Sequence, residues 1–139
     1  MILATSDFRV ALGNRRDRRH VAAQAALEQW SKAGVVSTWP VLTEVARLFV
    51  ARANPDQAVA FVDAIARGAC AIPDPPDDAL RRAHALMRRC RNLPMDLVDD
   101  SLVVLAEEPG EGRILSTGMC DFGVYRRKNA QPFANALLC

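Results

Sequence analysis

Apolar residues occur along this chain in two patterns, short continuous runs and longer stretches at helical spacing. The short runs are typical of buried strands, and they fall at Met1 to Ala4, Val35 to Ser37, Ala69 to Ile72 and Arg113 to Thr117. Between them, apolar positions at i, i+3, i+4 and i+7 predict helices, which span 20–30, 38–52, 54–68, 77–90 and 96–108. Residues 5–7 predict a polar turn after the first strand.

Two of the predicted helices begin with capping residues. Thr38 is a good N-cap with Pro40 in the first turn, where proline is tolerated, and Asn54 followed by Pro55 has the same arrangement. The apolar spacing also predicts which residues of helices 20–30 and 77–90 face the core. They are Val21, Ala25, Leu27, Leu80, Ala83, Leu86 and Met87.

Strands that alternate with helices predict a mainly parallel sheet with helices on both faces, because parallel neighbours need crossover connections. A chain of 139 residues fits one such domain, so we expect a single three-layer α/β/α unit over residues 1–139. Right-handed crossovers bring the C-terminal ends of the strands to one edge of the sheet, where ligands bind in α/β folds. Residues 5–7 and 117–121 fall at that edge.

Two acids on predicted helices can reach the same edge. Glu44 lies at the border of the apolar stripe of helix 38–52, a position that also fits a solvated residue. Asp99 lies among apolar residues of helix 96–108, where a charge is costly unless it is paired, hydrogen-bonded or bound to a metal. The alternative for Asp99 is the third helical position after an N-cap at Asp96, where the helix dipole stabilises a carboxylate.

Composition adds one hint about partners. The net charge is only +2, but sixteen of the eighteen basic residues are arginine, whose planar guanidinium binds phosphate through two hydrogen bonds. An Arg-rich codon usage explains the same ratio. The densest basic clusters are Arg15, Arg16, Arg18 and Arg19, and then Arg81, Arg82, Arg88 and Arg89.

Other features of composition narrow the class of protein. No apolar run reaches the roughly 20 residues that a membrane span needs, and residues 1–12 do not resemble a secretory signal, so we expect a cytoplasmic protein without a membrane partner. The four cysteines are scattered singly, which predicts free thiols and no zinc site.

Four motifs taken together resemble the PIN-domain family, in particular the VapC-like toxins of toxin–antitoxin pairs. They are MILATSDFRVALGNRRDRRH at the start of the chain, TWPVLTEV, LPMDLVDDSLVVLAE and GRILSTGMCDFGVYR, in that order from Met1 to about Phe133. The resemblance implies a three-layer α/β/α PIN-like fold. It also implies an endoribonuclease in which a few acidic residues bind Mg²⁺ or Mn²⁺ and cleave RNA.

The resemblance assigns the metal site only in part. Glu44 and Asp99 match two of the family's metal-site acids and are the expected catalytic residues, whereas Thr5 and Gly118 stand where the other two acids are expected. With two carboxylates fewer, affinity for Mg²⁺ or Mn²⁺ should fall sharply. Asp7 and Asp121 are nearby acids that could move into the site.

Two functional interpretations follow from that incomplete site. The first is a weakened or rearranged metal-dependent endoribonuclease. The second is a catalytically degenerate PIN module that binds RNA or an antitoxin protein without cleaving. Either one uses basic side chains on RNA, and either one is expected to form a homodimer through apolar surface left on residues 58–65 and 80–87. The RNA-binding candidates are Arg15, Arg16, Arg18, Arg19 and Arg126.

Overall fold

A parallel sheet lies at the centre of the computed structural model, which describes residues 1–92, 96–107, 113–116 and 133–135. All pairs of neighbouring strands are parallel, and the strand order is β2-β1-β3-β4. The strands are β1 (Ile2–Ala4), β2 (Val35–Val36), β3 (Arg113–Leu115) and β4 (Ala134–Asn135). The first strand of the chain is therefore central, and its C-terminal end lies beside that of β3.

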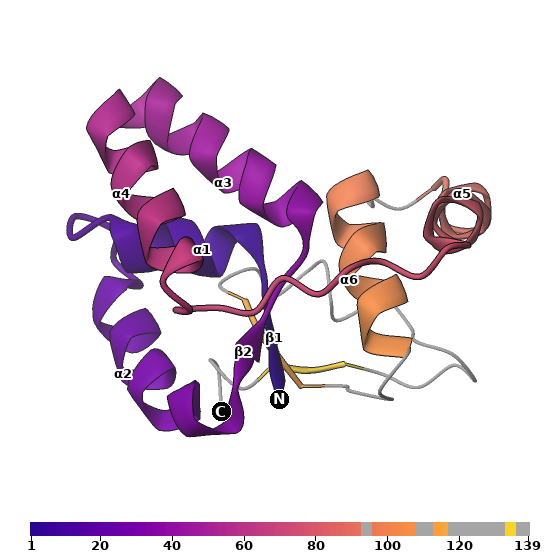
Figure 1. Ribbon diagram of the computed structural model, residues 1–139, viewed down its shortest axis with the longest axis horizontal. Coiled ribbons are helices and arrows are strands. Elements are labelled where there is room, and N and C mark those ends of the chain that lie inside the picture. The colour runs from indigo at the N-terminus through magenta and orange to yellow at the C-terminus, as the bar shows by residue number, and fades with distance from the viewer. Residues whose placement is uncertain (93–95, 108–112, 117–132, 136–139) are drawn as a thin grey trace.

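Six described α-helices and one 3₁₀ turn surround the sheet (Figure 1). They are α1 (Ser6–Gly13), α2 (His20–Trp30), η1 (Ser31–Ala33), α3 (Trp39–Arg52), α4 (Pro55–Ala66), α5 (Ala79–Arg89) and α6 (Leu97–Glu107). The predicted caps are confirmed, because the Thr38 hydroxyl accepts from the Val41 N–H at 3.4 Å and the Asn54 side chain accepts from the Gln57 N–H at 2.9 Å. Capping residues of this kind satisfy backbone donors that a helix start leaves free.

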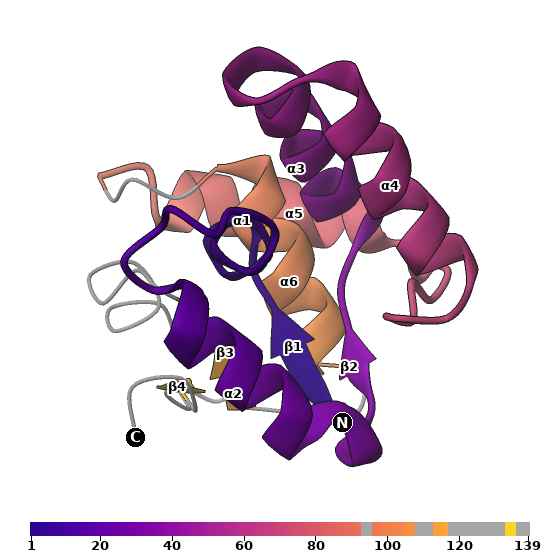
Figure 2. The ribbon, with the colours of Figure 1, turned by 90° about the vertical axis from the view of Figure 1, so that its left-hand side faces the viewer.

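The strands send alternate side chains to two separate apolar cores, as period-two geometry requires. Leu3, Val36 and Ile114 pack with α3 and α6, whereas Ile2 and Leu115 pack on the other face with α1 and α2. Figure 2 shows α1 and α2 in front of the sheet and α6 behind it. The predicted three-layer α/β/α fold with a parallel sheet is confirmed.

Two predicted elements differ from the structure, and one observed strand was not predicted. The third predicted strand, Ala69 to Ile72, is reduced to one isolated parallel bridge between Val36 and Ala71. The predicted polar turn over residues 5–7 is instead the start of α1, because Thr5 caps a helix whose Phe8 and Ala11 are fully buried. Strand β4 was not predicted at all, since two residues carry no detectable alternation.

The predicted inner faces of two helices are also partly wrong. On α2, Val21 is 77% exposed and Ala23 and Ala26 are buried instead, because this helix packs closely against α1 and favours small residues at the contact. On α5, Leu80 is 76% exposed and Met87 42% exposed, and only Ala83 and Leu86 of the predicted set are buried. Within the described ranges, no helix combines the length and apolar character that crossing a membrane requires.

Candidate functional site

Buried hydroxyl groups tie together the C-terminal ends of β1, β2 and β3. The Thr5 hydroxyl reaches the carbonyl oxygen of Leu115 at 3.0 Å, and the Ser37 hydroxyl donates to the carbonyl oxygen of Ala4 at 2.8 Å. Thr5, Ser37 and Ser116 are each less than 5% exposed. The edge of the sheet where α/β folds bind ligands is therefore polar and fixed in place.

Asp7 brings a carboxylate to the point where β1 and β3 end. Its Oδ2 accepts a hydrogen bond from the Ser116 hydroxyl at 3.0 Å, and its Oδ1 accepts from the Phe8 N–H at 2.7 Å. The Thr5 hydroxyl also contacts Asp7 Oδ1. These donors come from two strand ends and the first turn of α1, so they fix the orientation of a half-buried acid.

A second polar contact joins the starts of α3 and α6. The hydroxyls of Thr38 and Ser101 lie 2.7 Å apart, and Ser101 donates to the carbonyl oxygen of Val98 at 2.6 Å. Because Ser101 uses its proton there, Thr38 is the donor between the two hydroxyls. The contact holds the helices of Glu44 and Asp99 together at the sheet edge, and both acids are half-buried.

The deepest acid on α6 is Asp100, so the sequence-based view of Asp99 as the buried acid was wrong. Asp100 is 0% exposed, and neither of its carboxylate oxygens has a hydrogen-bond partner in the described structure. Burial, and secondarily the charge of Asp96, raises the pKa of Asp100 to about 6. The expected cap at Asp96 is confirmed, because its side chain accepts from the Asp99 N–H at 3.0 Å.

The neighbouring helix α5 explains why Asp100 is buried more deeply than Asp99. Asp100 stands one helical turn before Val103 and Val104, which pack against Ala83 and Leu86 of α5. That face of α6 is covered by α5. The helical wheel of α6 is apolar around most of its circumference, so the wheel alone does not indicate which acid lies under the cover.

The structure unites some of the expected site residues. Thr5 stands at the end of β1, as expected, and Asp7 lies against it. Across the described ranges there is no group of three or more His, Cys, Asp or Glu side chains placed to hold a metal. Gly118, Asp121 and Arg126 lie outside the described residues. Mg²⁺ usually takes one or two carboxylates along with waters and phosphate, so Asp7 with its two hydroxyl neighbours fits such an ion only in part.

Sequence reasoning missed the hydroxyl contacts that hold this edge. Ser116 was noted only within a motif, and Ser101 was not singled out. The available signal was their position, since Ser116 follows a strand directly and Ser101 lies in the first turns of a helix. Small hydroxyl residues at such places commonly bond to backbone or to neighbouring polar groups.

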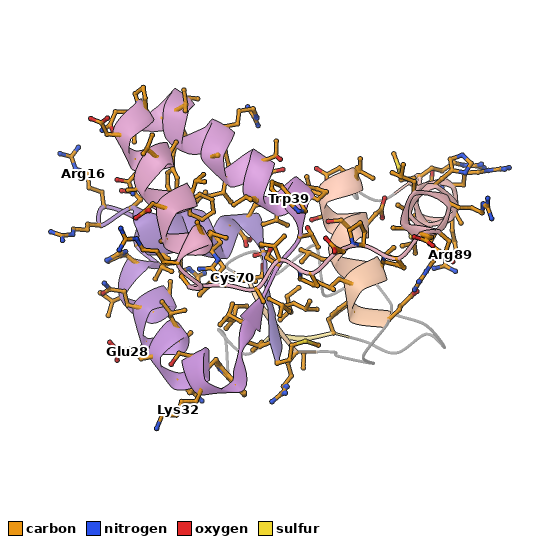
Figure 3. All side chains as sticks on the ribbon, viewed as in Figure 1. Arg16, Glu28, Lys32, Trp39, Cys70 and Arg89 are labelled. Atoms are coloured by element: carbon orange, nitrogen blue, oxygen red, sulfur yellow. The ribbon has the colours of Figure 1, made fainter. Side chains whose placement is uncertain are left out.

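The two basic clusters form separate surfaces. Arg15, Arg16 and Arg18 are exposed on the loop between α1 and α2, and Arg19 is half-buried there. Figure 3 shows Arg16 pointing away from the molecule at one end of its longest axis and Arg89 of α5 at the other. The α5 cluster is smaller than expected, as Arg82 is engaged by Glu107 at 2.8 Å and by Asp78 at 3.5 Å.

Comparison with known proteins identifies the fold. No protein-family model matches the chain, and neither does any curated protein. The crystal structure of VapC20 from Mycobacterium tuberculosis, a sarcin-ricin loop cleaving toxin, aligns with a TM-score of 0.75 at 22% identity, over 85% of this chain and 90% of that chain. The crystal structure of VapBC2 from Rickettsia felis, bound to a DNA fragment from their promoter, aligns with a TM-score of 0.72 at 14% identity. The alignment covers 97% of this chain and 98% of that chain.

The chain has a VapC-like PIN-domain fold. The likeness to both structures covers most of each chain. On this PIN-domain fold, the polar edge with Thr5, Asp7 and Ser116 is the candidate active site. The assignment of individual metal ligands there stays a prediction.

Proposed function

We propose that this chain is a VapC-type endoribonuclease that depends on Mg²⁺ or Mn²⁺ and works with an incomplete acidic site. The observation that carries the proposal is the placement of Asp7. Its carboxylate is held by Ser116 and contacts Thr5, the residue that stands where the family resemblance expects an acid. An acid two positions along the chain thereby supplies a charge that Thr5 lacks.

The residues of the chain would divide the work as follows. A bound divalent ion lowers the pKa of a water molecule and stabilises charge on the phosphate. Asp7 would hold the ion from the β1 edge, while Ser116 and the Phe8 N–H keep its carboxylate oriented. Glu44 and Asp99 would act from α3 and α6, whose starts are joined by Thr38 and Ser101.

Cleavage assays test the roles of the three acids. We expect Asp7→Asn, Glu44→Gln and Asp99→Asn each to reduce Mn²⁺-dependent cleavage at least about tenfold, because each removes a charge from a site that already lacks two. A sarcin-ricin loop RNA is a suitable first substrate, given the activity of the structural neighbour VapC20. Asp74→Asn, at an exposed acid in the linker before α5, is the matched control and should cleave like the original protein.

The pattern of losses separates two kinds of failure. Full activity in Asp7→Asn with none in Glu44→Gln and Asp99→Asn would show that Asp7 takes no part in the site. No metal-dependent cleavage by the unmodified protein, together with tight RNA or antitoxin binding, would favour the second candidate, a degenerate PIN module. The lack of a three-acid group among the described residues favours that candidate, and the VapBC2 neighbour suggests an antitoxin as its partner.

Salt dependence tests the proposed RNA contacts. If the exposed arginines bind phosphate, RNA affinity should fall with salt at a slope of about −0.7 per contacted phosphate for single strands. The two clusters lie at opposite ends of the molecule, so they can be tested separately. If the α1–α2 loop binds RNA, replacing Arg15, Arg16 and Arg18 with Gln should reduce the slope. If α5 binds RNA, the same change at Arg81, Arg88 and Arg89 should reduce it.

A control and a contrary outcome complete this titration. Arg67→Gln changes an exposed arginine that already pairs with Asp63 and should leave the slope unchanged. Equal binding after both triple changes would leave codon usage as the explanation of the arginine content.

The expected homodimer has a candidate surface. An apolar groove of about 160 Å³ is lined by residues from α3, α5 and α6 and from the proline-rich linker before α5. Leu80 is 76% exposed on its wall, and Trp39, which Figure 3 labels at the start of α3, is 60% exposed. Exposed apolar surface of this kind is typical of protein–protein contacts.

Light scattering at tens of micromolar tests the homodimer. We expect a dimer mass for the original chain and a monomer mass for Leu80→Glu, because a charge on the groove wall opposes burial. Val21→Glu places the same charge at a valine that is 77% exposed on α2 and should leave the dimer intact. A monomer mass for the original chain would contradict the prediction.

A further inference from the structure

Apolar packing alone leaves the rotation of α6 about its own axis weakly defined. Leu102 and Ala106 pack in the core that α3 shares, whereas Val103 and Val104 pack against α5. A helix that is apolar on most sides can turn about its axis and still bury apolar surface. The groove of about 160 Å³ beside α6, lined in part by Leu97, also leaves open space there instead of close packing. A directional contact is therefore needed to fix where each side chain of α6 points.

Ser101 makes such a contact with α3. The Val41 N–H donates to the Thr38 hydroxyl at 3.4 Å, and the Thr38 hydroxyl lies 2.7 Å from Ser101 Oγ, to which it donates. Ser101 in turn donates to the carbonyl oxygen of Val98 at 2.6 Å. Each hydroxyl thus accepts one hydrogen bond and donates another, an arrangement in which the bonds strengthen one another. This chain of hydrogen bonds joins α3 to α6, which lie side by side at this point (Figure 1).

The position of Ser101 relative to Asp99 gives this contact its consequence. The two residues are two positions apart, so their side chains leave α6 about 160° apart. Ser101 therefore holds one side of the helix while Asp99 extends from the other. At a helix radius of about 5–6 Å, a turn of about 20° would move the Asp99 carboxylate by about 2 Å. Groups of an active site need placement within about 0.5 Å.

We infer that Ser101 is a positioning residue for Asp99, and that its contact with Thr38 sets the rotation of α6. The inference rests on the proposed function, in which Asp99 and Glu44 act at one metal site. Thr38 precedes Glu44 by six residues and caps the same helix, so the contact fixes the two acids relative to each other. A polar contact in apolar surroundings fixes the register of helices in coiled coils in the same way.

An ion pair further along α6 cannot supply this alignment. Glu107 pairs with Arg82 at 2.8 Å, which ties α6 to α5, a helix that carries neither proposed acid. Asp100 gives no direction either, because its carboxylate oxygens have no hydrogen-bond partner in the described structure. The relation between α3 and α6 therefore depends on the two hydroxyls.

NMR relaxation dispersion of backbone amides measures the rotation of α6 without metal or RNA. In Ser101→Ala we expect microsecond-to-millisecond exchange at the α6 amides, whereas the original chain and Ser101→Thr, which keeps the hydroxyl, should show none. Ser31→Ala is the matched control, because the exposed Ser31 also donates to a carbonyl three residues back, that of Glu28 at 3.1 Å. Its α6 amides should show no exchange. An α6 without exchange in Ser101→Ala would overturn the inference.

Cleavage kinetics measure what the rotation does to the site. With Mn²⁺, Ser101→Ala should lower kcat about 10- to 100-fold, because a displacement of about 1 Å can cost that much. The KM for RNA should stay unchanged, since the basic surfaces are intact, and Ser101→Thr should restore kcat. In a Glu44→Gln background, Ser101→Ala should cost less than about threefold, because residues that act as a unit are not additive.

The two measurements separate failure of the inference from failure of the proposed function. Exchange in α6 with an unchanged kcat would overturn the positioning role of Ser101. A loss of kcat that is equal with Glu44 and with Gln at position 44 would overturn it too, because the effect would then not act through the paired acids. If the original chain neither cleaves RNA nor binds Mn²⁺, the proposed function fails, and the dispersion measurement still decides whether Ser101 sets the rotation of α6.

Discussion

Replacing Asp100 with Asn is expected to stabilise the protein by about 2–3 kcal/mol at pH 8. Asp100 is fully buried, and neither carboxylate oxygen has a partner in the described structure. The rise of its pKa from 3.8 to about 6 corresponds to about 3 kcal/mol of preference for the neutral form. Asn keeps the shape of the neutral acid without its proton equilibrium, so the variant avoids the cost of a buried charge.

The pH dependence of stability follows from the direction of this shift. Between about pH 4 and pH 6 the folded state binds more protons at Asp100 than the unfolded state does, so the free energy of unfolding falls as the pH rises through this window. The original protein should therefore lose stability between pH 4 and about pH 7. The Asp100→Asn variant should be as stable as the original protein near pH 4, and its free energy of unfolding should fall less above that pH.

Urea unfolding at several pH values measures both effects. Asp74→Asn, at an exposed acid, is the matched control and should follow the original protein at every pH. Two results would show that the Asp100 carboxylate has a partner in solution. One is a free energy of unfolding of the original protein that rises from pH 4 to pH 7, and the other is an Asp100→Asn variant that is less stable than the original at pH 8.

Restoring the two expected acids is predicted to have the largest effect on function. Thr5→Asp combined with Gly118→Asp should raise Mn²⁺ affinity by about 10- to 100-fold and increase RNA cleavage with it, because both changes add carboxylates to one metal site. The double change should exceed the sum of the single changes, since neighbouring sites are not additive. Asp is also a good N-cap, so the start of α1 at position 5 should persist.

The same variant should be less stable without metal. Thr5 now contacts the carboxylate of Asp7, and a carboxylate in its place would repel that group. Added Mn²⁺ should reverse the loss, because it binds the native state alone. Calorimetric titration measures the affinity for Mn²⁺, and thermal unfolding measures the stability with and without the ion. A double variant that binds Mn²⁺ no better than the original would show that positions 5 and 118 are not metal-site positions.

The fold could be predicted because local and global signals agree. Thr38 and Asn54 cap helices that begin where the sequence places them, and the short apolar runs at 1–4 and 113–117 contain the central strands β1 and β3. Alternation of such runs with helices leaves few topologies other than a parallel sheet covered on both faces. The position of Thr5 at the end of a central strand follows from the same pattern.

The direction of single side chains could not be predicted in the same way. Helix α6 is apolar on most sides, so nothing in its spacing distinguishes Asp99 from Asp100, and the cover supplied by α5 decides the matter. On α2, valine and alanine compete for the inner face, and close packing selects alanine. Asp7 is oriented by a hydrogen bond from Ser116, which directly follows β3 and is far away in the sequence.

The pairing of β1 with β3 makes the sheet the last part of the fold to close during synthesis. The Thr5 side chain bonds to a carbonyl 110 positions further along the chain, and Leu3 pairs with Ile114. The α3–α4 pair, by contrast, is formed by neighbours in sequence and can assemble early. As chains emerge from the ribosome N-terminus first, β1 stays unpaired on that side until β3, more than a hundred residues further along, has been made. The segment with Thr5 and Asp7 therefore contacts Ser116 only after residue 116 has left the ribosome, and a nascent chain that stops before it has no assembled site.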